Sequence, residues 1–228
     1  MTITALEPEG DNLWTVTRPL KILGLTMATR MTVVRLSSGE LLLHSPVKFD
    51  PQLQSALDEI GTPRHLVAPN RFHHLFLPAY KHAYPEALSY AAPGLAQKRR
   101  DFTFDQTLGS EAPAAWRDEL DQIIVAGVPM LNEVVFFHRA SGTLILTDLA
   151  FNVGPNSPFG LRLWARLNLA YGRLQPTALV KTLFRDKTAA RASIDHILRL
   201  DFERVIMAHG DVARHRAKAH LTAAYRWL

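Results

Sequence analysis

The chain has 228 residues, of which 47% are apolar and 21% charged, the composition of an ordinary globular protein that can bury a sizeable core. It contains no cysteine, which excludes disulfides, thiolate catalysis and cysteine-ligated zinc or iron–sulfur sites. No apolar run reaches the roughly 18 residues that a membrane-spanning helix needs. The first ten residues lack the basic region of a signal peptide, so we expect a cytoplasmic protein.

The formal net charge of +5 conceals an asymmetry between the two parts of the chain. Residues 160–228 contain 13 Lys and Arg against 5 Asp and Glu, a net charge of +8, whereas residues 1–159 contain 13 against 16, a net charge of −3. Such a basic segment could attract an anionic substrate, an acidic partner or a nucleic acid. Because no aromatic-interleaved pattern of an RNA- or DNA-binding module accompanies it, we expect solvated helix faces and rank nucleic acid last.

The first part of the chain reads as β structure followed by strand–helix–strand units. Apolar, β-rich runs at 20–25, 31–36 and 41–47 predict strands, and the Ser-Ser-Gly turn before Glu40 predicts that the last two form a hairpin. A helix over 50–60 would begin with Asp50 as N-cap and Pro51 in the first position. A strand at 65–69 follows, then a short helix at 78–86 and a strand at 87–91. This order predicts parallel pairing in an α/β sheet.

The second part begins with an undecided stretch, 116–124, and continues with a clear hairpin. Its strands lie at 133–138 and 143–148, separated by a turn that contains Ala-Ser-Gly. Segments 160–170 and 176–200 read as helical, 204–208 as a buried strand and 212–228 as a basic terminal helix. No linker marks a boundary, so we expect a single domain, 1–228.

The helical segment 160–170 has an uncertain partner. Arg162 and Arg166 fall on one face together with Arg173, and Leu163 and Leu167 lie elsewhere around the helix. Such a helix could lie on a membrane surface. Packing on the core or on a second subunit is the expected role, which leaves a homodimer open.

Polar residues that could bind a ligand follow the strand at 65–69. Pro69 ends that strand, and Asn70, His73 and His74 come directly after it, where open α/β sheets bind their ligands. Adjacent histidines point to opposite faces of a strand, but on a loop both could point to a common centre. Neutral imidazole is the commonest metal ligand in proteins, so a metal is the first candidate for that centre. A solvated loop with two ordinary histidines is the alternative.

Two further strands end on residues of the same kind. Asp148 ends the second strand of the later hairpin, and His209 follows the strand at 204–208, with Asp211 beside it. A single Asp at a strand end is usually a turn residue, and a single His is usually satisfied by a hydrogen bond. Three such strand ends on one edge of an α/β sheet favour a functional site.

Four short motifs carry a resemblance to a known superfamily. They are Leu-His-Ser-Pro-Val at 43–47, Ala-Pro-Gly-Leu at 92–95, Ser-Gly-Thr-Leu-Ile-Leu-Thr-Asp-Leu at 141–149 and Ala-His-Gly-Asp at 208–211. With the order of elements, they resemble the metallo-β-lactamase superfamily, and more closely a branch catalogued as a domain of unknown function. The resemblance covers most of the chain and implies an α/β fold, an αββα sandwich with a metal site at one edge of two sheets.

The metal-binding residues of the superfamily are only partly present. Its first motif is H-x-H-x-D-H, and the corresponding stretch here is Pro-Asn-Arg-Phe-His-His at 69–74. If His74 is the last histidine of the motif, Pro69 and Arg71 replace the first two histidines and His73 replaces the aspartate. A register shifted by one places Asn70 at the first histidine and Phe72 at the second.

The remaining ligand positions are mixed. The histidine that normally follows a Thr-Pro-Gly is absent from 125–130, whereas Asp148 matches the bridging aspartate and His209 the last histidine. The resemblance therefore implies at best half of a dinuclear zinc site.

The residues that remain could hold one divalent metal ion. A catalytic zinc needs about three protein ligands and an open position, and His73 or His74, Asp148 and His209 would supply them. Zinc is the first expectation, and iron or manganese also suit these ligands. The metal would lower the pKa of water from 15.7 to about 7, so we expect hydrolysis of an ester, thioester, amide or phosphoester.

Further residues complete the predicted site. Asp148 and Asp211 are the expected catalytic residues, with Asp211 or His44 as proton carrier. His44, Asn70 and Arg71 are expected to line the substrate pocket, and an anionic small molecule is one candidate substrate. The competing hypothesis is a superfamily member without metal that acts as a small-molecule-binding or accessory protein. A nucleic-acid-processing enzyme is the third.

Overall fold

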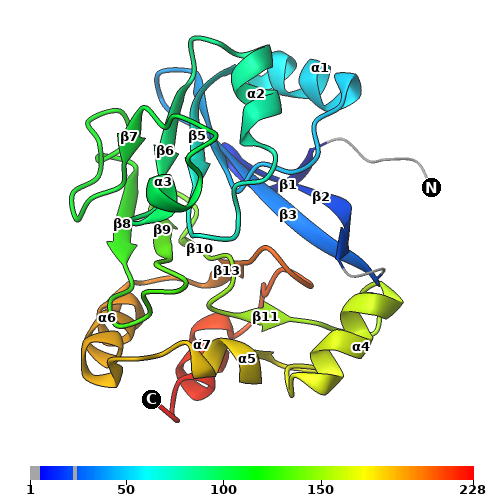
Figure 1. Cartoon of the computed structure of the whole chain (residues 1–228), viewed down its shortest axis with the longest axis vertical. Coiled ribbons are helices and arrows are strands. Elements are labelled where there is room, and N and C mark those ends of the chain that lie inside the picture. Colours follow the sequence, from blue (N-terminus) through cyan, green and yellow to red (C-terminus); the bar gives the residue numbers. More distant parts are fainter. Residues whose placement is uncertain (1–5, 23–24) are drawn as a thin grey trace. The chain divides into compact units, whose positions relative to one another are not determined.

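The computed structural model describes residues 6–22 and 25–228 of the chain (Figure 1). The chain divides into two compact units. The N-terminal unit comprises residues 1–18 and 30–109, and the C-terminal unit comprises residues 19–29 and 110–228. Residues 1–5 of the segment assessed for a signal peptide, and Leu23 and Gly24 of the strand expected at 20–25, lie outside the described residues.

The N-terminal unit is built on a mixed sheet whose strands follow chain order, β1 to β7. The strands are β1 (Glu7–Gly10), β2 (Leu13–Ile22), β3 (Leu25–Arg35), β4 (Glu40–His44), β5 (Thr62–Ala68), β6 (Leu88–Ala91) and β7 (Gln106–Thr107). Strands β3 and β4 pair antiparallel, which confirms the predicted hairpin, and β4, β5 and β6 pair in parallel. The parallel pairs confirm both predicted strand–helix–strand units.

Two helices of this unit form where the sequence predicts them, over 51–60 and 77–83, and a third, over 95–98, is not predicted. They are α1 (Pro51–Ile60), α2 (Leu77–Ala83) and the short α3 (Leu95–Lys98). The Asp50 carboxylate accepts a hydrogen bond from the Leu53 N–H at 2.8 Å and so caps α1. Leu53 and Leu57 are buried in the apolar core of the unit. Because α1 and α2 both pack against β5, the loop after β5 is held at a rigid strand end.

The C-terminal unit contains a four-stranded mixed sheet in the order β13-β10-β9-β8 and a small two-stranded sheet. Its strands are β8 (Leu120–Ile124), β9 (Val134–His138), β10 (Thr143–Ile145), β11 (Phe151–Asn152), β12 (Leu174–Gln175) and β13 (Arg204–Ile206). The antiparallel β9–β10 pair confirms the predicted hairpin. The undecided stretch 116–124 ends as β8, an edge strand of this sheet.

The helices of the C-terminal unit differ from the predicted ones in length. They are α4 (Phe159–Leu167), α5 (Ala178–Thr182), α6 (Lys187–Arg199) and α7 (Ala217–Ala224). The prediction of one helical segment over 176–200 is wrong, because the segment is divided into α5 and α6. The Asp186 carboxylate accepts a hydrogen bond from the Ala189 N–H and so caps the start of α6. Helix α4 ends at Leu167, so Arg173 does not lie on it. Within the described residues, no helix is both long enough and apolar enough to cross a membrane.

The three strand ends that carry candidate ligands belong to two sheets. Strand β5 lies in the seven-stranded sheet, whereas β10 and β13 are parallel neighbours in the four-stranded sheet. The expectation that all three ends share one edge of one sheet is therefore wrong. The physical reason is that the sheet of the N-terminal unit ends at β7 and that β8 starts a new one.

A leucine occupies a left-handed position at the end of α4. After the C-cap Asn168, Leu169 has φ +56°, and the Ala170 N–H bonds the Ala165 carbonyl at 2.7 Å. This hydrogen bond defines a Schellman motif, in which Gly normally takes the left-handed position. The Leu169 side chain is 76% exposed and so gains little from packing.

We expect Leu169→Gly to raise the free energy of unfolding by about 0.5 kcal/mol. The left-handed conformation costs leucine about 1–2 kcal/mol, and glycine removes this cost. Glycine also gives the unfolded chain more conformational freedom, which lowers the stability by about 0.4–1 kcal/mol. Urea denaturation measures the difference. Leu167→Gly is the matched control, because Leu167 is equally exposed but helical, and it should lose about 1 kcal/mol. A loss of stability in Leu169→Gly would contradict the account.

Candidate functional site

Asp148 and His209 lie side by side in the C-terminal unit. Strands β10 and β13 are paired in register at Ile145 and Ile206, and each of the two residues comes three positions after its strand. The equal offsets bring Asp148 Oδ1 within 3.5 Å of His209 Nε2. Both residues are buried, at 8% and 7% exposure. Parallel strand pairing thus brings these two predicted site residues together.

The hydrogen bond on the far side of the His209 ring decides which nitrogen carries its proton. His209 Nδ1 lies 2.7 Å from the Ala28 carbonyl oxygen. Because a carbonyl can only accept, Nδ1 donates, and the lone pair of the neutral ring is on Nε2. This lone pair faces the Asp148 carboxylate, so a cation, either a proton or a metal ion, is required to make the arrangement favourable.

The spacing of these two atoms fits a shared metal ion. Two ligands placed about 2.1 Å from a tetrahedral ion lie about 3.4 Å apart. The observed separation of Asp148 Oδ1 and His209 Nε2 is 3.5 Å. The bond from Nδ1 to a backbone carbonyl is also the usual support of a metal-binding histidine. Donor chemistry and spacing therefore both suit a divalent ion.

Packing around His209 fixes its ring and backbone. The Phe151 ring stacks on the His209 ring with a centroid distance of 5.1 Å and an interplanar angle of 6°. The next residue, Gly210, has φ +91° and pairs with Asn152 of β11. A Cβ at Gly210 would lie 2.2 Å from the Asn152 carbonyl oxygen. Only glycine fits there, which explains the His-Gly pair in physical terms.

Glu133 positions the turn that carries Asp148. Its two carboxylate oxygens accept hydrogen bonds from the backbone N–H groups of Thr147 at 2.7 Å and Asp148 at 2.8 Å. The Glu133 side chain is fully buried, and burial, together with the nearby charge of Asp148, raises its pKa. Sequence reasoning missed this residue. The available signal was a single charged residue at the start of the apolar strand 133–138.

His73 is oriented within the N-terminal unit by two neighbours. Asn70 Oδ1 accepts hydrogen bonds at 2.8 Å from the backbone N–H groups of Phe72 and His73, which shapes the loop after β5 as an Asx turn. His73 Nδ1 lies 2.7 Å from the Ser45 hydroxyl oxygen. Ser45, a residue that sequence reasoning missed, has φ +58°. The contact with the Ser45 hydroxyl orients the His73 ring.

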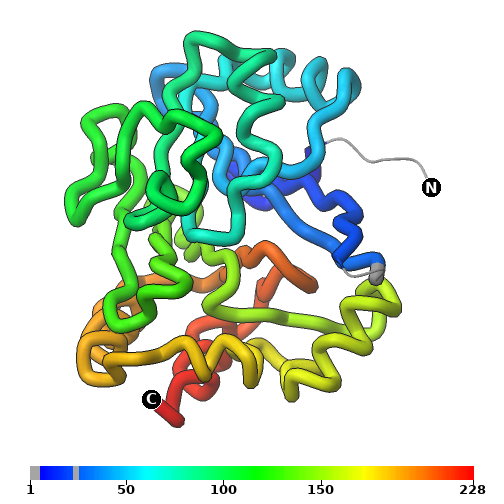
Figure 2. Tube along the Cα trace, in the orientation of Figure 1, coloured from blue at the N-terminus to red at the C-terminus, as the bar shows by residue number. Residues whose placement is uncertain are grey.

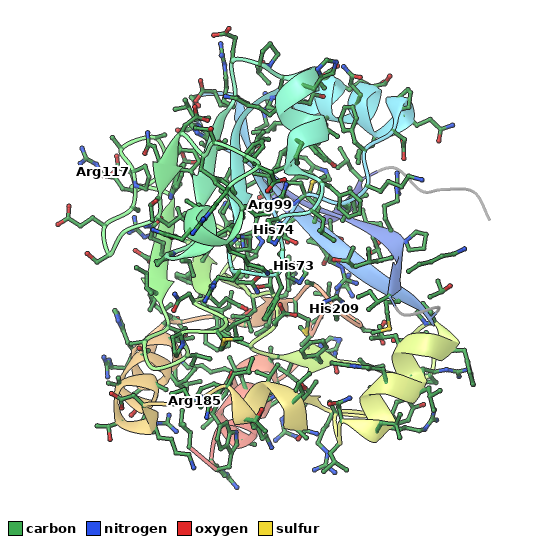
Figure 3. All side chains as sticks on the ribbon, in the orientation of Figure 1. His73, His74, Arg99, Arg117, Arg185 and His209 are labelled. Carbon is green, nitrogen blue, oxygen red and sulfur yellow. The ribbon has the colours of Figure 1, made fainter. Side chains whose placement is uncertain are left out.

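His74 has a different partner, Arg99, as Figure 3 shows. His74 Nδ1 lies 2.7 Å from Arg99 Nη1, and because a guanidinium can only donate, Nδ1 must accept. The proton of the neutral ring is then on Nε2. Burial and the charges of Lys98 and Arg99 lower the pKa of His74 to about 4. Both ring nitrogens are thereby committed, so His73 is the better candidate ligand of the two.

The other predicted site residues have distinct surroundings. Burial, and next the charge of His73, lower the pKa of His44 to about 3, so His44 is neutral near pH 7. Arg71 is half-buried, and its carbonyl oxygen accepts from Lys98 Nζ at 2.5 Å. Asp211 is exposed, and its backbone N–H bonds the Asn152 carbonyl of β11 at 2.7 Å.

Residues 10–181 match the model of a family described as a domain of unknown function, DUF4336. The chain belongs to the DUF4336 family. A search of curated proteins finds no match.

Solved structures show the fold that this DUF4336 member adopts. A metallo-β-lactamase from Erythrobacter litoralis is 11% identical, with a TM-score of 0.70, and the match covers 98% of this chain and 96% of that one. A metallo-β-lactamase from Pontibacter korlensis is 12% identical, with a TM-score of 0.66 and coverage of 96% and 97%. The metallo-β-lactamase FIM-1 from Pseudomonas aeruginosa, in a mono-zinc form, is 13% identical, with a TM-score of 0.64 and coverage of 96% and 92%. At these identities the likeness shows the fold alone. The DUF4336 chain is a mixed α/β protein with the metallo-β-lactamase fold, which confirms both the predicted fold class and the resemblance.

We expect Gly210→Ala to destabilise the protein by about 3 kcal/mol. The new methyl group would overlap the Asn152 carbonyl, and the left-handed φ would be strained. Thermal unfolding monitored by circular dichroism measures the loss. Gly172→Ala is the matched control, because Gly172 has φ +79° but no atom within 4 Å of the point where a Cβ would lie. Equal losses in the two variants would show that the close approach at Asn152 is unimportant.

We expect Glu133→Gln to cost about 2 kcal/mol of stability, because one of two buried N–H groups would face an amide NH₂ instead of an acceptor. If a metal is bound, its affinity should fall about 10- to 100-fold through the misplaced Asp148. Urea denaturation and metal titration measure the two effects. The exposed Glu111 provides the control, Glu111→Gln. Unchanged stability in Glu133→Gln would contradict the assigned role.

Proposed function

We propose that the chain is a metal-dependent hydrolase with a mononuclear site formed by His73, Asp148 and His209. The observation that carries the proposal is the His209 Nε2 lone pair, which faces Asp148 Oδ1 at 3.5 Å. Zinc is the first candidate ion, and iron or manganese also suit two imidazoles and a carboxylate.

His73 is proposed as the third ligand on three grounds. His73, Asp148 and His209 each offer one ligand atom, an imidazole nitrogen or a carboxylate oxygen. Within its own unit, the contact of Nδ1 with the Ser45 hydroxyl orients the His73 ring. The similar metallo-β-lactamases extend over both units, and one of them is described in a mono-zinc form. The single domain over 1–228 stays a prediction.

A bound divalent ion would supply Lewis acidity, which makes water nucleophilic near neutral pH. The chain supplies the orientation. The Ala28 carbonyl fixes the proton of His209 on Nδ1, and Glu133 holds the backbone at Asp148. Asp211, exposed beside β11, is the proposed carrier of protons to solvent.

The proposed substrate class is based on the charges near His73. Arg71 lies in the loop that also carries His73, and Lys98 bonds that loop, so an anionic ester, thioester, amide or phosphoester is the proposed substrate. Asn70 and Arg71 would line its pocket together with His44. The cytoplasmic location stays a prediction.

A protein without metal is the second candidate, and a specific observation favours it. The motif H-x-H-x-D-H is broken at Pro69 and Arg71, and His74 is engaged by Arg99. In that case a proton would lie between Asp148 and His209, which would form an ion pair. The chain would then bind a small molecule without activating water.

Elemental analysis of protein purified without a histidine tag distinguishes the two candidates. We expect about one equivalent of zinc, iron or manganese in the wild type, and its loss in His73→Ala and in His209→Ala. His74→Gln and the exposed-residue control His220→Ala should retain the metal. Removal of the metal by a chelator should also lower the melting temperature, because the ion binds only the folded state.

Each outcome has a distinct meaning. A wild-type protein that contains no metal and takes up no added zinc overturns the hydrolase proposal. Loss of metal in His209→Ala but not in His73→Ala would remove His73 from the ligand set. Loss in His74→Gln would show that the contact with Arg99 is not maintained in solution.

A further inference from the structure

Helix α4 of the C-terminal unit (Figure 1) carries exposed apolar side chains on one face. Phe159, Leu163 and Leu167 are spaced four residues apart and are 68%, 36% and 75% exposed. Residues four apart fall on one face of a helix. The opposite face is buried, with Leu161 and Ala165 in the core of the unit. Helix α4 therefore packs on the core through one apolar face and exposes a second apolar face, which we call the stripe, to solvent.

The stripe continues beyond the helix. Figure 2 follows the chain from α4 into α5, and the Ala178 N–H bonds the Asn168 carbonyl at 2.8 Å, which ties the start of α5 to the end of α4. Leu169 and Leu179, next to these two residues, are 76% and 55% exposed. We call the five side chains the α4 patch; they are Phe159, Leu163, Leu167, Leu169 and Leu179.

Leu169 shows that the patch is not explained by folding alone. Its φ of +56° is unfavourable for leucine, and its side chain makes little contact with the unit. Glycine would give the same turn without strain or exposed apolar surface. A residue that is unfavourable both in its backbone conformation and in its exposure to solvent is expected at a position where its side chain contacts a binding partner.

The chain segment that carries the patch has charged residues of one sign only. Between Leu149 and Arg185 the chain has no Asp or Glu, but it has five cations, Arg162, Arg166, Arg173, Lys181 and Arg185. Arg162 and Arg166 are on α4 itself. The Arg166 guanidinium lies over the Tyr171 ring at 3.9 Å, and Arg162 donates to the Pro155 carbonyl at 3.2 Å. The surroundings therefore favour a negatively charged partner.

We propose that the α4 patch docks on an anionic lipid surface. The patch combines Phe and Leu with flanking arginines on a short amphipathic helix, which is the pattern of helices that lie in the membrane interface. Its side chains project from the convex surface of a helix, as insertion between lipid headgroups requires. A second copy of the chain would bring five cations against five, so self-association through this patch is disfavoured. The proposal does not depend on the metal site.

Co-sedimentation of the full chain with vesicles tests the proposal. We expect binding to vesicles of phosphatidylcholine and phosphatidylglycerol in equal amounts, little binding to phosphatidylcholine alone, and weakening as salt increases. Phe159→Ser and Leu167→Ser should each weaken binding about tenfold. Leu88→Ser, at an exposed leucine of the N-terminal unit, is the matched control and should bind as wild type.

Two further variants separate docking from folding. Leu169→Gly should weaken vesicle binding about fivefold while the melting temperature stays the same or rises, which a structural role alone would not produce. Arg173→Glu or Arg185→Glu should weaken binding about tenfold, whereas Arg117→Glu should not. Arg117 and Arg185 lie on well-separated parts of the C-terminal unit (Figure 3).

Three outcomes would overturn the proposal. The first is equal binding to neutral and anionic vesicles at all salt concentrations. The second is absence of vesicle binding together with a dimer that Leu167→Ser dissociates in analytical ultracentrifugation, which would make the patch a self-interface. The third is absence of vesicle binding together with salt-dependent binding to polyglutamate that Arg173→Glu removes, which would make it a site for an acidic protein.

Discussion

The candidate site depends on a buried nitrogen lone pair that faces a buried carboxylate. Neighbouring groups hold His209 and Asp148 in this arrangement. The Ala28 carbonyl fixes the proton of His209 on the far nitrogen, and Glu133 holds the backbone that carries Asp148. Two electron-rich atoms 3.5 Å apart in a buried position are unfavourable without a cation between them. The fold thus supports this geometry over several elements.

The arrangement of strands could largely be predicted because each unit is assembled from local signals. The Ser-Ser-Gly and Ala-Ser-Gly turns define the two hairpins, and Asp50 with Pro51 defines the start of α1. Asp148 and His209 could be paired because each follows an apolar strand by a short step. What local signals could not show is which strands share a sheet. That depends on long-range pairing, and for this reason the sequence alone suggests that β5, β10 and β13 end on one edge of the same sheet.

The supporting residues of the site were harder to predict than its ligands. Glu133 acts through two backbone N–H groups that are 14 and 15 residues away in the chain, and the Ala28 carbonyl is 181 residues from His209. A backbone carbonyl has no signature in a sequence, and a single glutamate at a strand start is usually exposed. The choice between His73 and His74 likewise depended on Ser45 and Arg99, which are 28 and 25 residues from their partners. Such contacts become visible only once the strands are placed.

Backbone strain connects the two regions to which we assign a function. Among the described residues, non-glycine positions with positive φ include Asn12 and Asn132, where the short amide side chain tolerates the conformation. Ser45, Leu169 and Arg216, the N-cap of α7, are different, because none of these residue types favours it. Ser45 places its hydroxyl against His73, and Leu169 places an apolar side chain in solvent beside α4. Strain that gives no benefit to packing persists where the position of the side chain itself is needed. This strain is consistent with both proposals: the loop after β4 orients His73, the proposed third metal ligand, and the turn after α4 presents Leu169 to the proposed partner surface.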